Sequence, residues 1–418
     1  MRILIIAQQW EPEEGTPQRR WAPLVEGLIA RDHIVDVVAP PPHYPGGTLT
    51  SNDPKVQSGA VAVGRHGETV WRCNFSPHDQ RLRTRIVDQG HVMLSSIRTG
   101  LRLVKRYHPD VVIATAPPLP AAYAAACVGK LGKTPYIVDL RDVWPDLLKY
   151  TKEWTVDQKQ KSRSSVIYSS MFSVATSFFT RLTNKTLDGA AGIVTTTPSF
   201  AERLRDRGYK NVVNVRNLGS VLPQAVPPRV SHNPGSLKVL YLGTTGRAQG
   251  LSNVISAVRL AQAQGTDIQM RIIGSGASLA GLKDKAEGTG IEFLGRIPRA
   301  DVMEHYEWTD TSLVHLRDWA PLKFCVPSKF YEALSSGRHV TVVANGEVER
   351  IINETGAGMA VPAMDPHALA DAWTFLANNL GLLEVGDRGT RWLAERETPD
   401  ENANKFVDFV EHVANESE

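Results

Sequence analysis

The sequence predicts an α/β fold made of two doubly wound domains that face each other across a cleft. Two observations lead to this prediction: continuous apolar runs alternate with helical patterns, and the same alternation starts again about halfway along the chain. Strands that are apolar on both faces are typical of parallel sheets covered by helices on each side. A chain of 418 residues is long enough to give each domain its own core.

The expected elements follow one another in a regular order. In the first half the pattern predicts strands and helices in the order strand 2–7, helix 21–30, strand 34–39, strand 110–116, helix 119–132 and strand 135–140. The second half restarts with a strand that resembles the first one, and the predicted strands are 237–243, 268–274, 291–295, 311–316 and 339–345. Residues 51–85 lack clean periodicity and are expected to form a long loop or an irregular insertion.

A proline-rich segment separates the two halves. Residues 219–236 contain four prolines and little periodicity, which is typical of an interdomain linker. We therefore expect a first domain over 1–218 and a second over 219–399. The last helix, 400–418, is expected to pack back on the first domain because it carries an apolar stripe. The members of this stripe are Phe406, Phe409, Val410 and Val413.

Composition and charge exclude several classes of protein. The chain has 47 basic and 44 acidic residues and a formal charge of +3, which is too balanced for a nucleic-acid binder. Cys73, Cys127 and Cys325 are widely spaced, so neither a disulfide framework nor a zinc site is suggested, and a reducing compartment fits. The first apolar run is too short for a signal peptide, and prolines interrupt the apolar stretch 111–129. A soluble or peripheral protein of the cytoplasm is expected.

The loops that follow strands are the expected places for a ligand, because open parallel sheets bind ligands beyond the carboxyl ends of their strands. Gly15 precedes the first helix, whose amides could face an anion, although a simple tight turn is the favoured interpretation. The loop at 243–250 places Gly243, Thr244, Gly246 and Arg247 between a strand and a helix, but it is no Walker loop. A solvent-exposed Arg247 without a ligand is an equally open alternative.

The segment "PSKFYEALSSG" predicts a helix whose first turn is suited to a phosphate. Ser328 and Lys329 open the helix, where unpaired amides and the positive end of the dipole gather. Glu332 lies one turn further in and could accept hydrogen bonds from a vicinal diol such as ribose. The alternative is a capped surface helix with an incidental pair of Lys329 and Glu332.

The segment "VDLRDVWPD" gathers charged residues at the end of an apolar strand. Asp139, Arg141, Asp142 and Asp146 surround Trp144, and such clustering indicates a functional loop. The alternative is a salt bridge of Arg141 that only closes the loop. The sequence contains no H-E-x-x-H, no G-x-S-x-G and no D-x-D motif. Metal-dependent hydrolysis, serine acyl transfer and D-x-D sugar-nucleotide chemistry therefore lose support, and no metal ligands are predicted.

Taken together, these loops resemble the retaining family 4 glycosyltransferases of GT-B fold, and more closely their bacterial surface-polysaccharide branch. The resemblance runs over nearly the whole chain, and its most specific motifs are "LRDVWPD", "AQGL" and "PSKFYEALSSG". It implies two Rossmann-like domains, the first on the acceptor side and the second binding the nucleotide sugar.

The resemblance also implies roles for individual residues. Glu332 matches the second glutamate of the E-x7-E signature, which holds the ribose hydroxyls, and Ser328 and Lys329 match the helix start beside the diphosphate. Gly15 matches a loop glycine near the same group. The remaining matches are Arg296 and Ile297 in the segment that lines the base, Gly274 in a nearby loop, and Asp142 where many members place a histidine close to the reacting sugar.

Three positions depart from the family pattern. The first glutamate of E-x7-E falls on Phe324, and the usual arginine and lysine of the second-domain loop are Thr244 and Gln249. The "NG-x-D" that usually ends the first domain reads "NLGS" at 217–220. The departures leave Arg247 and Lys329 as the nearest cations, and they affect the identity of the donor more than the fold.

The expected activity is transfer of a hexosyl or N-acetylhexosaminyl group from a nucleotide diphosphate sugar, with UDP favoured, and with retention. Arg247 and Lys329 would stabilise the leaving diphosphate without a metal or cofactor, and Asp142 would orient the donor sugar or accept the acceptor's proton. The acceptor would be a glycan, a glycolipid or a lipid-linked sugar. A non-hydrolytic UDP-sugar epimerase and a non-enzymatic two-lobed binding protein are the alternatives.

Two segments bear on membrane contact. Residues 81–108 mix basic residues with an apolar stripe, and 164–185 carry aromatic residues at helical spacing. Peripheral binding at the inner face of the cell membrane is one interpretation. Burial of each stripe against its own sheet is the favoured one. No nucleic-acid partner is expected.

Overall fold

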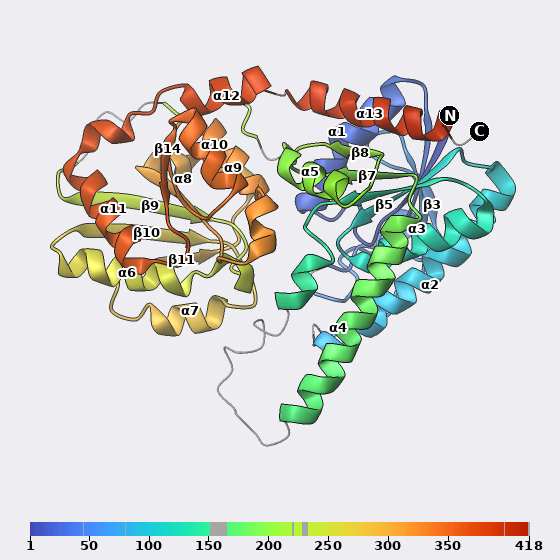
Figure 1. Cartoon of the computed structure of the whole chain (residues 1–418), viewed down its shortest axis with the longest axis horizontal. Coiled ribbons are helices and arrows are strands. Elements are labelled where there is room, and N and C mark those ends of the chain that lie inside the picture. Colours follow the sequence, from blue (N-terminus) through green and yellow to red (C-terminus); the bar gives the residue numbers. More distant parts are fainter. Residues whose placement is uncertain are drawn as a thin grey trace. The chain divides into compact units, whose positions relative to one another are not determined.

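The structure is a computed structural model that describes residues 1–44, 46–79, 81–150, 165–219, 221–227, 233–396 and 398–416. The chain divides into two compact units (Figure 1). The first unit comprises Met1–Gly219 together with Pro399–Glu418, and the second comprises Ser220–Thr398. Each unit is built on its own sheet.

The first unit alternates strands with helices. Its strands are β1 (Arg2–Ile6), β2 (Ile34–Ala39), β3 (Val61–Val63), β4 (Thr69–Arg72), β5 (Val111–Ala116), β6 (Tyr136–Leu140), β7 (Gly192–Thr195) and β8 (Val212–Asn214). Its helices are α1 (Thr16–Ala30), α2 (Leu82–Tyr107), α3 (Leu119–Gly132), α4 (Ser165–Asp188), α5 (Pro198–Asp206) and α13 (Pro399–Asn415). The sheet order is β3-β4-β2-β1-β5-β6-β7-β8, and every pairing is parallel except that of β3 with β4.

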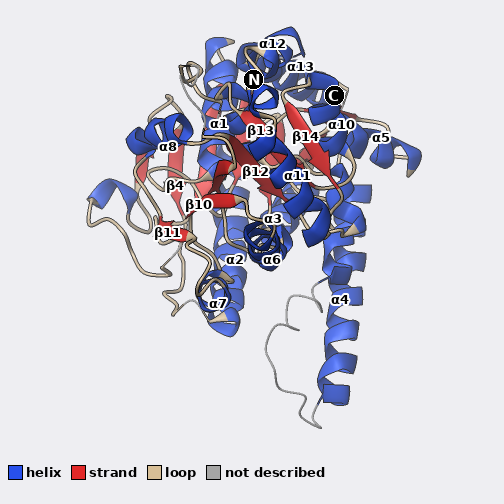
Figure 2. Cartoon of the chain, turned by 90° about the vertical axis from the view of Figure 1, so that its left-hand side faces the viewer, coloured by secondary structure: helices blue, strands red, loops and turns tan. Residues whose placement is uncertain are grey.

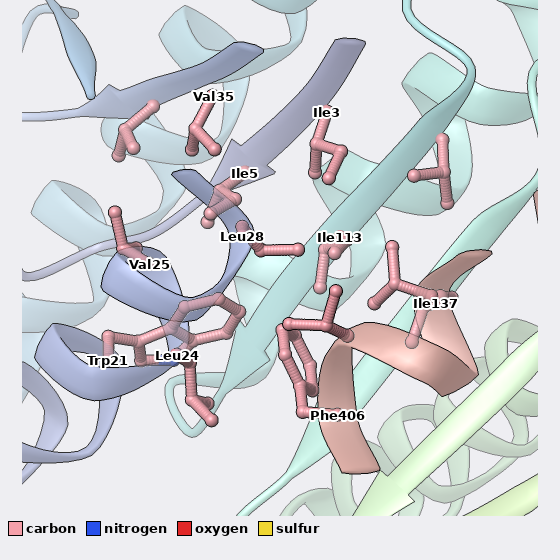
Figure 3. Packing of buried hydrophobic residues seen from close by; sticks show 14 of the residues in the cluster. Ile3, Ile5, Trp21, Leu24, Val25, Leu28, Val35, Ile113, Ile137 and Phe406 are labelled. Carbon is pink, nitrogen blue, oxygen red and sulfur yellow. The ribbon is translucent and has the colours of Figure 1, made fainter. Parts of the chain in front are cut away.

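Helices α1 and α13 pack together and cover one face of this sheet. In α1 the residues Trp21, Leu24, Val25 and Leu28 repeat at helical spacing and are buried. Phe406 of α13 meets Trp21 edge to face, with 5.5 Å between the ring centroids (Figure 3). Such a contact contributes about 0.5–1.5 kcal/mol beyond the burial of its area. The apolar stripe of the last helix thus completes the core that the start of the chain begins.

The second unit repeats the architecture. Its strands are β9 (Ser236–Leu242), β10 (Asp267–Ile273), β11 (Glu292–Gly295), β12 (Thr311–His315), β13 (His339–Val343) and β14 (Gly358–Val361). Its helices are α6 (Ser252–Ala263), α7 (Leu279–Lys285), α8 (Val302–Trp308), α9 (Ser328–Ser335), α10 (Glu347–Thr355), α11 (Pro366–Asn378) and α12 (Arg388–Arg396). The sheet order is β11-β10-β9-β12-β13-β14, and all its pairings are parallel.

Helices cover both faces of the second sheet. Figure 1 shows α6 and α7 on one side of it and α9, α10 and α12 on the other, and Figure 2 shows α11 in front of the strands. Trp373 of α11 and Val258 of α6 are buried in one cluster with Val239 of β9. The next residue of β9, Leu240, points to the opposite face of the sheet and is buried as well. The strands are therefore apolar on both faces, as their unbroken apolar runs indicate.

These findings confirm the predicted fold class, two doubly wound α/β units. One local expectation is wrong: part of 51–85 is not loop, because Thr69–Arg72 forms β4 and pairs in parallel with β2, and Val61–Val63 pairs with β4. Sequence periodicity misses them because strands of three or four residues are too short to show a period.

Candidate functional site

The candidate residues of the second unit lie at the carboxyl ends of parallel strands. The loop from Gly243 to Gly246 follows β9, the loop starting at Gly274 follows β10, and Arg296 and Ile297 follow β11. Helix α9 is reached from β12 through a short 3-10 helix, η5 (Ala320–Phe324). Four neighbouring segments thus end at the edge where doubly wound sheets bind ligands.

Two glycines let the loops after β9 and β10 lie backbone against backbone. Gly274 has φ of +140°, and a Cβ there would lie 1.8 Å from the carbonyl oxygen of Gly243. A Cβ at Gly276 would lie 2.5 Å from the backbone of Thr245, whose amide and carbonyl bond to the second loop. Side chains at 274 and 276 would separate the loops. Gly274 therefore has a packing role whatever ligand binds nearby.

Helix α9 places a buried carboxylate under exposed cations. Glu332 is 0% exposed. The Lys329 ammonium lies 3.0 Å from each of its oxygens, and the hydroxyl of Tyr306 donates to Oε1 at 3.2 Å. The Arg299 guanidinium lies 3.6 Å from Oε2 and is half exposed. Burial, together with the neighbouring carboxylate, raises the pKa of Tyr306 well above its usual value.

The start of α9 has no side-chain cap. Pro327 occupies the N-cap position and provides no side-chain cap, and Ser328 at the first position is buried. Pro327 thus supplies no side-chain acceptor to the first turn, and its carbonyl accepts from the Phe330 amide at 2.9 Å. Such a helix end favours an anion.

Arg247 lies in a 3-10 turn, η3 (Arg247–Gln249), directly after the glycine loop. Within the described part of the chain its guanidinium makes no hydrogen bond or ion pair, whereas its carbonyl accepts from Nε of Arg317 at 2.7 Å. His315 stabilises this turn, because its Nδ1 donates to the Gln249 carbonyl at 2.6 Å. Its other ring nitrogen lies 3.1 Å from the amide of Asn253. Burial lowers the pKa of His315 to about 4, so the ring is neutral.

Of the four charged residues in "VDLRDVWPD", three are occupied by structural contacts. Asp139 forms a two-pronged ion pair with Arg20, at 2.7 and 3.1 Å, and both side chains are buried. Asp146 pairs with Arg203 and Arg207, and Arg141 donates to the Pro117 carbonyl. The alternative of a loop closed by charged residues therefore describes these three.

Asp142 is different. It follows β6, is partly exposed, and its carboxylate makes no hydrogen bond or ion pair with the residues that the structure describes. Burial raises its pKa, and the charge of the neighbouring Arg141 opposes this shift. Asp142 is therefore the carboxylate of this loop that is available to a ligand.

The remaining candidates occupy loop positions. Gly15 is the N-cap of α1, with extended backbone and no side-chain cap. Thr244 is exposed, and its carbonyl accepts from the hydroxyl of Tyr241 at 2.7 Å. Gly246 is the N-cap of η3. Arg296 donates to the Ser275 hydroxyl at 2.9 Å, which ties the loop after β11 to the loop after β10.

Sequence reasoning missed Arg299 and Tyr306, which contact Glu332, and Gly276, which seats one loop on the other. Arg299 and Tyr306 carry no spacing signal, because they reach Glu332 only through the fold. Gly276 gave a signal in "GSG", but its packing role depends on the loop that it meets. Searched over the described residues, no helix is both long and apolar enough to cross a lipid bilayer.

The chain is similar to known glycosyltransferases along its length. Residues 15–217 match the family described as glycosyl transferase 4-like domain, and residues 236–379 match the glycosyl transferases group 1 family. The Pseudomonas aeruginosa protein WbjE, named as a probable glycosyltransferase, is 32% identical over 31% of this chain and 33% of its own length. WcaI of Escherichia coli K12, named for colanic acid biosynthesis, is 24% identical over 98% of this chain and 100% of its own length.

A solved structure gives the same fold. The structure of HepE from Anabaena in complex with UDP-glucose superposes with a TM-score of 0.65 at 12% identity, and it covers 99% of this chain and 100% of HepE. At that identity the likeness shows the fold alone. The two family matches fall one in each unit, so the chain belongs to the GT-B glycosyltransferases, with a glycosyl transferase 4-like domain in its first unit and a glycosyl transferases group 1 domain in its second.

Proposed function

We propose that the protein transfers a hexosyl or N-acetylhexosaminyl group from a UDP-linked donor, with retention, to a glycan, glycolipid or lipid-linked acceptor in surface polysaccharide synthesis. The similarity to WcaI, named for colanic acid biosynthesis, supports the process, and the structures of HepE in complex with UDP and with UDP-glucose support the donor. The domain ranges 1–218 with 400–418, and 219–399, are proposed as the acceptor-side and donor-side domains.

The observation that carries the proposal is the buried Glu332 beneath the start of α9. Burying a carboxylate costs desolvation free energy unless hydrogen-bond donors surround it. Lys329 contacts it at 3.0 Å while remaining about a quarter exposed, so the ammonium can be exchanged for other donors. A ribose diol supplies two hydroxyl donors of the required kind. On donor binding, the diol takes the place of Lys329, which turns to the diphosphate beside Ser328 and the uncapped amides.

Charge that develops on the leaving diphosphate is then met by fixed donors. Lys329, the Arg247 guanidinium and the first amides of α9 provide them, and each donor contributes about 2 to 4 kcal/mol to transition-state stabilisation in a dry site. Arg296 and Ile297 are proposed to line the base. Gly15, Gly243, Thr244, Gly246 and Gly274 are proposed as loop positions close to the donor. Protein cations supply the charge in this scheme, and no metal is assigned to the diphosphate.

Asp142 is proposed to act on the reacting sugars. Its carboxylate is unpaired within the described residues, and burial raises its pKa, which makes it a better proton acceptor at neutral pH. It either orients the donor sugar through a hydroxyl or takes the proton of the acceptor. An Asp142→Asn variant keeps the first role in part and loses the second.

A groove on the first unit suits an anionic, hydroxyl-rich acceptor. It has a volume of about 440 Å³ and lies between α4 and a 3-10 helix, η2 (Asp146–Tyr150). Its lining combines hydroxyls with two cations: Ser173, Thr176, Ser177, Thr180, Lys149 and Arg181, together with Leu148. We expect Lys149→Ala and Arg181→Ala to raise the KM for the acceptor and to leave the KM for the donor unchanged.

Apolar side chains beside this groove support peripheral membrane contact. Val174, Phe178 and Phe179 of α4 are exposed, and so are Ile86 and Val87 of α2. The first turns of α2 add the exposed cations Arg81, Arg83 and Arg85. Burial therefore accounts for only part of each predicted stripe, while residues 164–172 of the second stripe lie outside the described side chains. Exposed cations and exposed aromatic residues on this unit favour an anionic lipid surface at the inner face of the membrane.

Co-sedimentation with anionic vesicles tests the membrane contact. We expect the wild type to sediment with the vesicles and the double variant Phe178→Ser, Phe179→Ser to stay in the supernatant. Phe375→Ser is the matched control, since Phe375 is equally exposed but lies on α11 of the second unit. Equal sedimentation of all three proteins would remove the membrane contact from the proposal.

A thermal-shift panel of UDP, GDP and ADP tests donor binding, because a ligand that binds the folded state raises its stability by RT ln(1 + [L]/Kd). We expect UDP to raise the melting temperature most, and an unmoved transition with all three nucleotides would overturn the donor site.

Incubation with UDP-sugars alone tests the epimerase alternative. Interconversion of the sugars at C2 without an acceptor would show that the protein is an epimerase and not a transferase. An acceptor-dependent glycoside with the donor's anomeric configuration would exclude a mere binding protein.

A further inference from the structure

Three side chains with metal-binding atoms meet within the first unit, and none of them is among the residues assigned above. His43 lies in the loop after β2, His78 in the loop after β4, and Asp88 in α2. One ligand atom of each lies within 4.8 Å of the others. The three side chains are 5 to 8% exposed, so water does not surround them.

The hydrogen bonds around this cluster fix which atoms face each other. Oδ1 of Asp88 accepts from the Ser76 amide at 2.8 Å, which leaves Oδ2 toward the two rings. This Oδ2 lies 3.2 Å from Nε2 of His43 and 4.0 Å from Nε2 of His78. Nδ1 of His43 lies 2.8 Å from the Pro41 carbonyl and can bond there only as an N–H. In the neutral ring of His43, Nε2 is therefore a lone pair that faces a carboxylate.

The cation between these two acceptors is either a proton, which makes the 3.2 Å contact a hydrogen bond, or a metal ion. A charge-assisted N–H···O bond is about 2.7–2.9 Å long. Metal–nitrogen bonds of about 2.0–2.1 Å place tetrahedral ligands about 3.4 Å apart. The observed 3.2 and 4.0 Å lie on either side of the second value, and the 4.0 Å between Oδ2 of Asp88 and Nε2 of His78 is too long for a hydrogen bond. We propose that His43, His78 and Asp88 bind a first-row divalent transition metal, Zn²⁺ in the first place.

Neighbouring groups hold the ligands in position. Gly47 has φ of +81°, and a Cβ there would lie 2.4 Å from Nδ1 of His78, so a glycine is required for the ring to rest on this loop. Oε1 of Glu13 accepts from the amides of His43 and Tyr44 at 2.7 and 2.8 Å. Support of this kind orients metal-binding imidazoles.

The metal would join the loops after β2 and β4 to α2 at the carboxyl edge of the first sheet. Two imidazoles and one carboxylate are a ligand set that Zn²⁺ accepts, and they leave a fourth position for water or a ligand oxygen. The role is to order this edge of the sheet. The inference does not depend on the proposed sugar transfer, since none of the three ligands is assigned a role in it.

Metal binding to the untagged full chain tests this proposal. After removal of metals with a chelator, we expect one equivalent of Zn²⁺ to bind in calorimetry, and Co²⁺ to give the intense visible absorption of a tetrahedral site. Zn²⁺ should also raise the melting temperature. His78→Ala and Asp88→Asn should each weaken binding at least tenfold, and Asp88→Asn keeps the shape of the side chain in case the alanine variant folds poorly.

His66→Ala is the matched control. His66 also lies beside carboxylates, but Glu26 and Glu11 contact its two ring nitrogens at 2.8 and 3.0 Å. We expect this variant to bind one equivalent like the wild type. The proposal is overturned if the chelated wild type binds no stoichiometric Zn²⁺ or Co²⁺. It is equally overturned if His78→Ala and Asp88→Asn, folded by circular dichroism, keep the wild-type affinity and the Co²⁺ spectrum.

Discussion

The two units both place a carboxylate with cations near the carboxyl ends of their strands, but the two ion pairs differ in access to solvent. Arg20 and Asp139 of the first unit are 1% and 0% exposed, and Arg20 donates further to the carbonyls of Val215 and Arg216. Over Glu332 of the second unit, Lys329 and Arg299 remain 27% and 48% exposed. The first pair is closed and holds the unit together, while the second is open to exchange with a ligand.

The largest effect should come from breaking the closed pair. Arg20→Ala leaves the buried Asp139 carboxylate without its partner, which costs about 3–5 kcal/mol of unfolding free energy. Urea unfolding followed by tryptophan fluorescence measures it, since Trp21 lies next to the changed residue. Asp408→Ala, which removes an exposed partner of Arg31 in the same unit, is the control and should cost less than about 1 kcal/mol. Similar costs for both variants would contradict the distinction between closed and open pairs.

Breaking the open pair should affect transfer more than stability. Lys329→Met removes the ammonium that is proposed to stabilise the leaving diphosphate, and we expect kcat to fall by about 10² to 10³-fold. Tyr306 and Arg299 still contact Glu332, so the loss of stability should stay near 1 kcal/mol. Steady-state kinetics and thermal melting measure the two effects. A variant that loses more than about 3 kcal/mol of stability and keeps its kcat would make Lys329 structural, like Arg20.

If Glu332 binds the ribose diol, a Glu332 variant should no longer distinguish UDP from 2′-deoxy-UDP. A hydrogen bond to a charged acceptor contributes about 1.5–3 kcal/mol, so the wild type should bind UDP about 10 to 100-fold more tightly than 2′-deoxy-UDP. In Glu332→Gln this ratio should approach one, as measured by calorimetry. Asp142→Asn is the control: it should keep the ratio and lose transfer. If Glu332→Gln keeps the wild-type ratio, the ribose contact lies elsewhere.

The smallest expected effect is a difference between the two units in how their stability depends on pH. Burial lowers the pKa values of His315 and His339 in the second unit to about 4. Below the unfolded value of about 6.5 the unfolded chain binds more protons, so each histidine removes about 1 kcal/mol of stability at pH 6. In the first unit, burial acts to lower the pKa of His66, but Glu11 and Glu26 outweigh it and the pKa is raised. Its contribution is present at low pH and is lost as pH rises above the folded value.

Differential scanning calorimetry between pH 7.5 and 6 can test this contrast. Going from pH 7.5 to 6, we expect the melting transition of the second unit to move down and that of the first unit to move slightly up, because protonated His66 stabilises the first unit. His315→Gln retains a neutral polar side chain and should reduce the shift of the second unit. A parallel fall of both transitions, unchanged by His315→Gln, would show that the depressed histidines do not set the pH dependence.

The fold and part of the candidate site were predictable from the sequence. The strand at 34–39 and the helix at 119–132 have the predicted bounds, since long apolar runs and their flanking turns are local signals. The placement of Lys329 and Glu332 on one turn of α9 is also local, and it was predicted from spacing. Their direct contact had been the alternative to ligand binding, and the structure shows that contact.

Short elements and long-range partners were not predictable in the same way. Strand β4 has four residues and joins the sheet only because its register matches β2. The sequence does not tell which charged residues of "VDLRDVWPD" have a structural partner. In the fold, Arg20 reaches Asp139 across 119 positions, whereas Asp142 is unpaired within the described residues. Spacing along the chain carries no information on such contacts.

The sequence by itself thus determined the two alternating α/β halves and the charged first turn of α9, because both depend on neighbours along one strand or one helix. The tertiary structure decided what those charges contact. It brought Arg299 and Tyr306 to Glu332, sealed Asp139 beneath Arg20, and gathered His43, His78 and Asp88 from three separate segments. The physical reason is that electrostatic and metal-binding contacts act over a few ångströms in space, and only the packing of the sheets and helices brings distant segments that close.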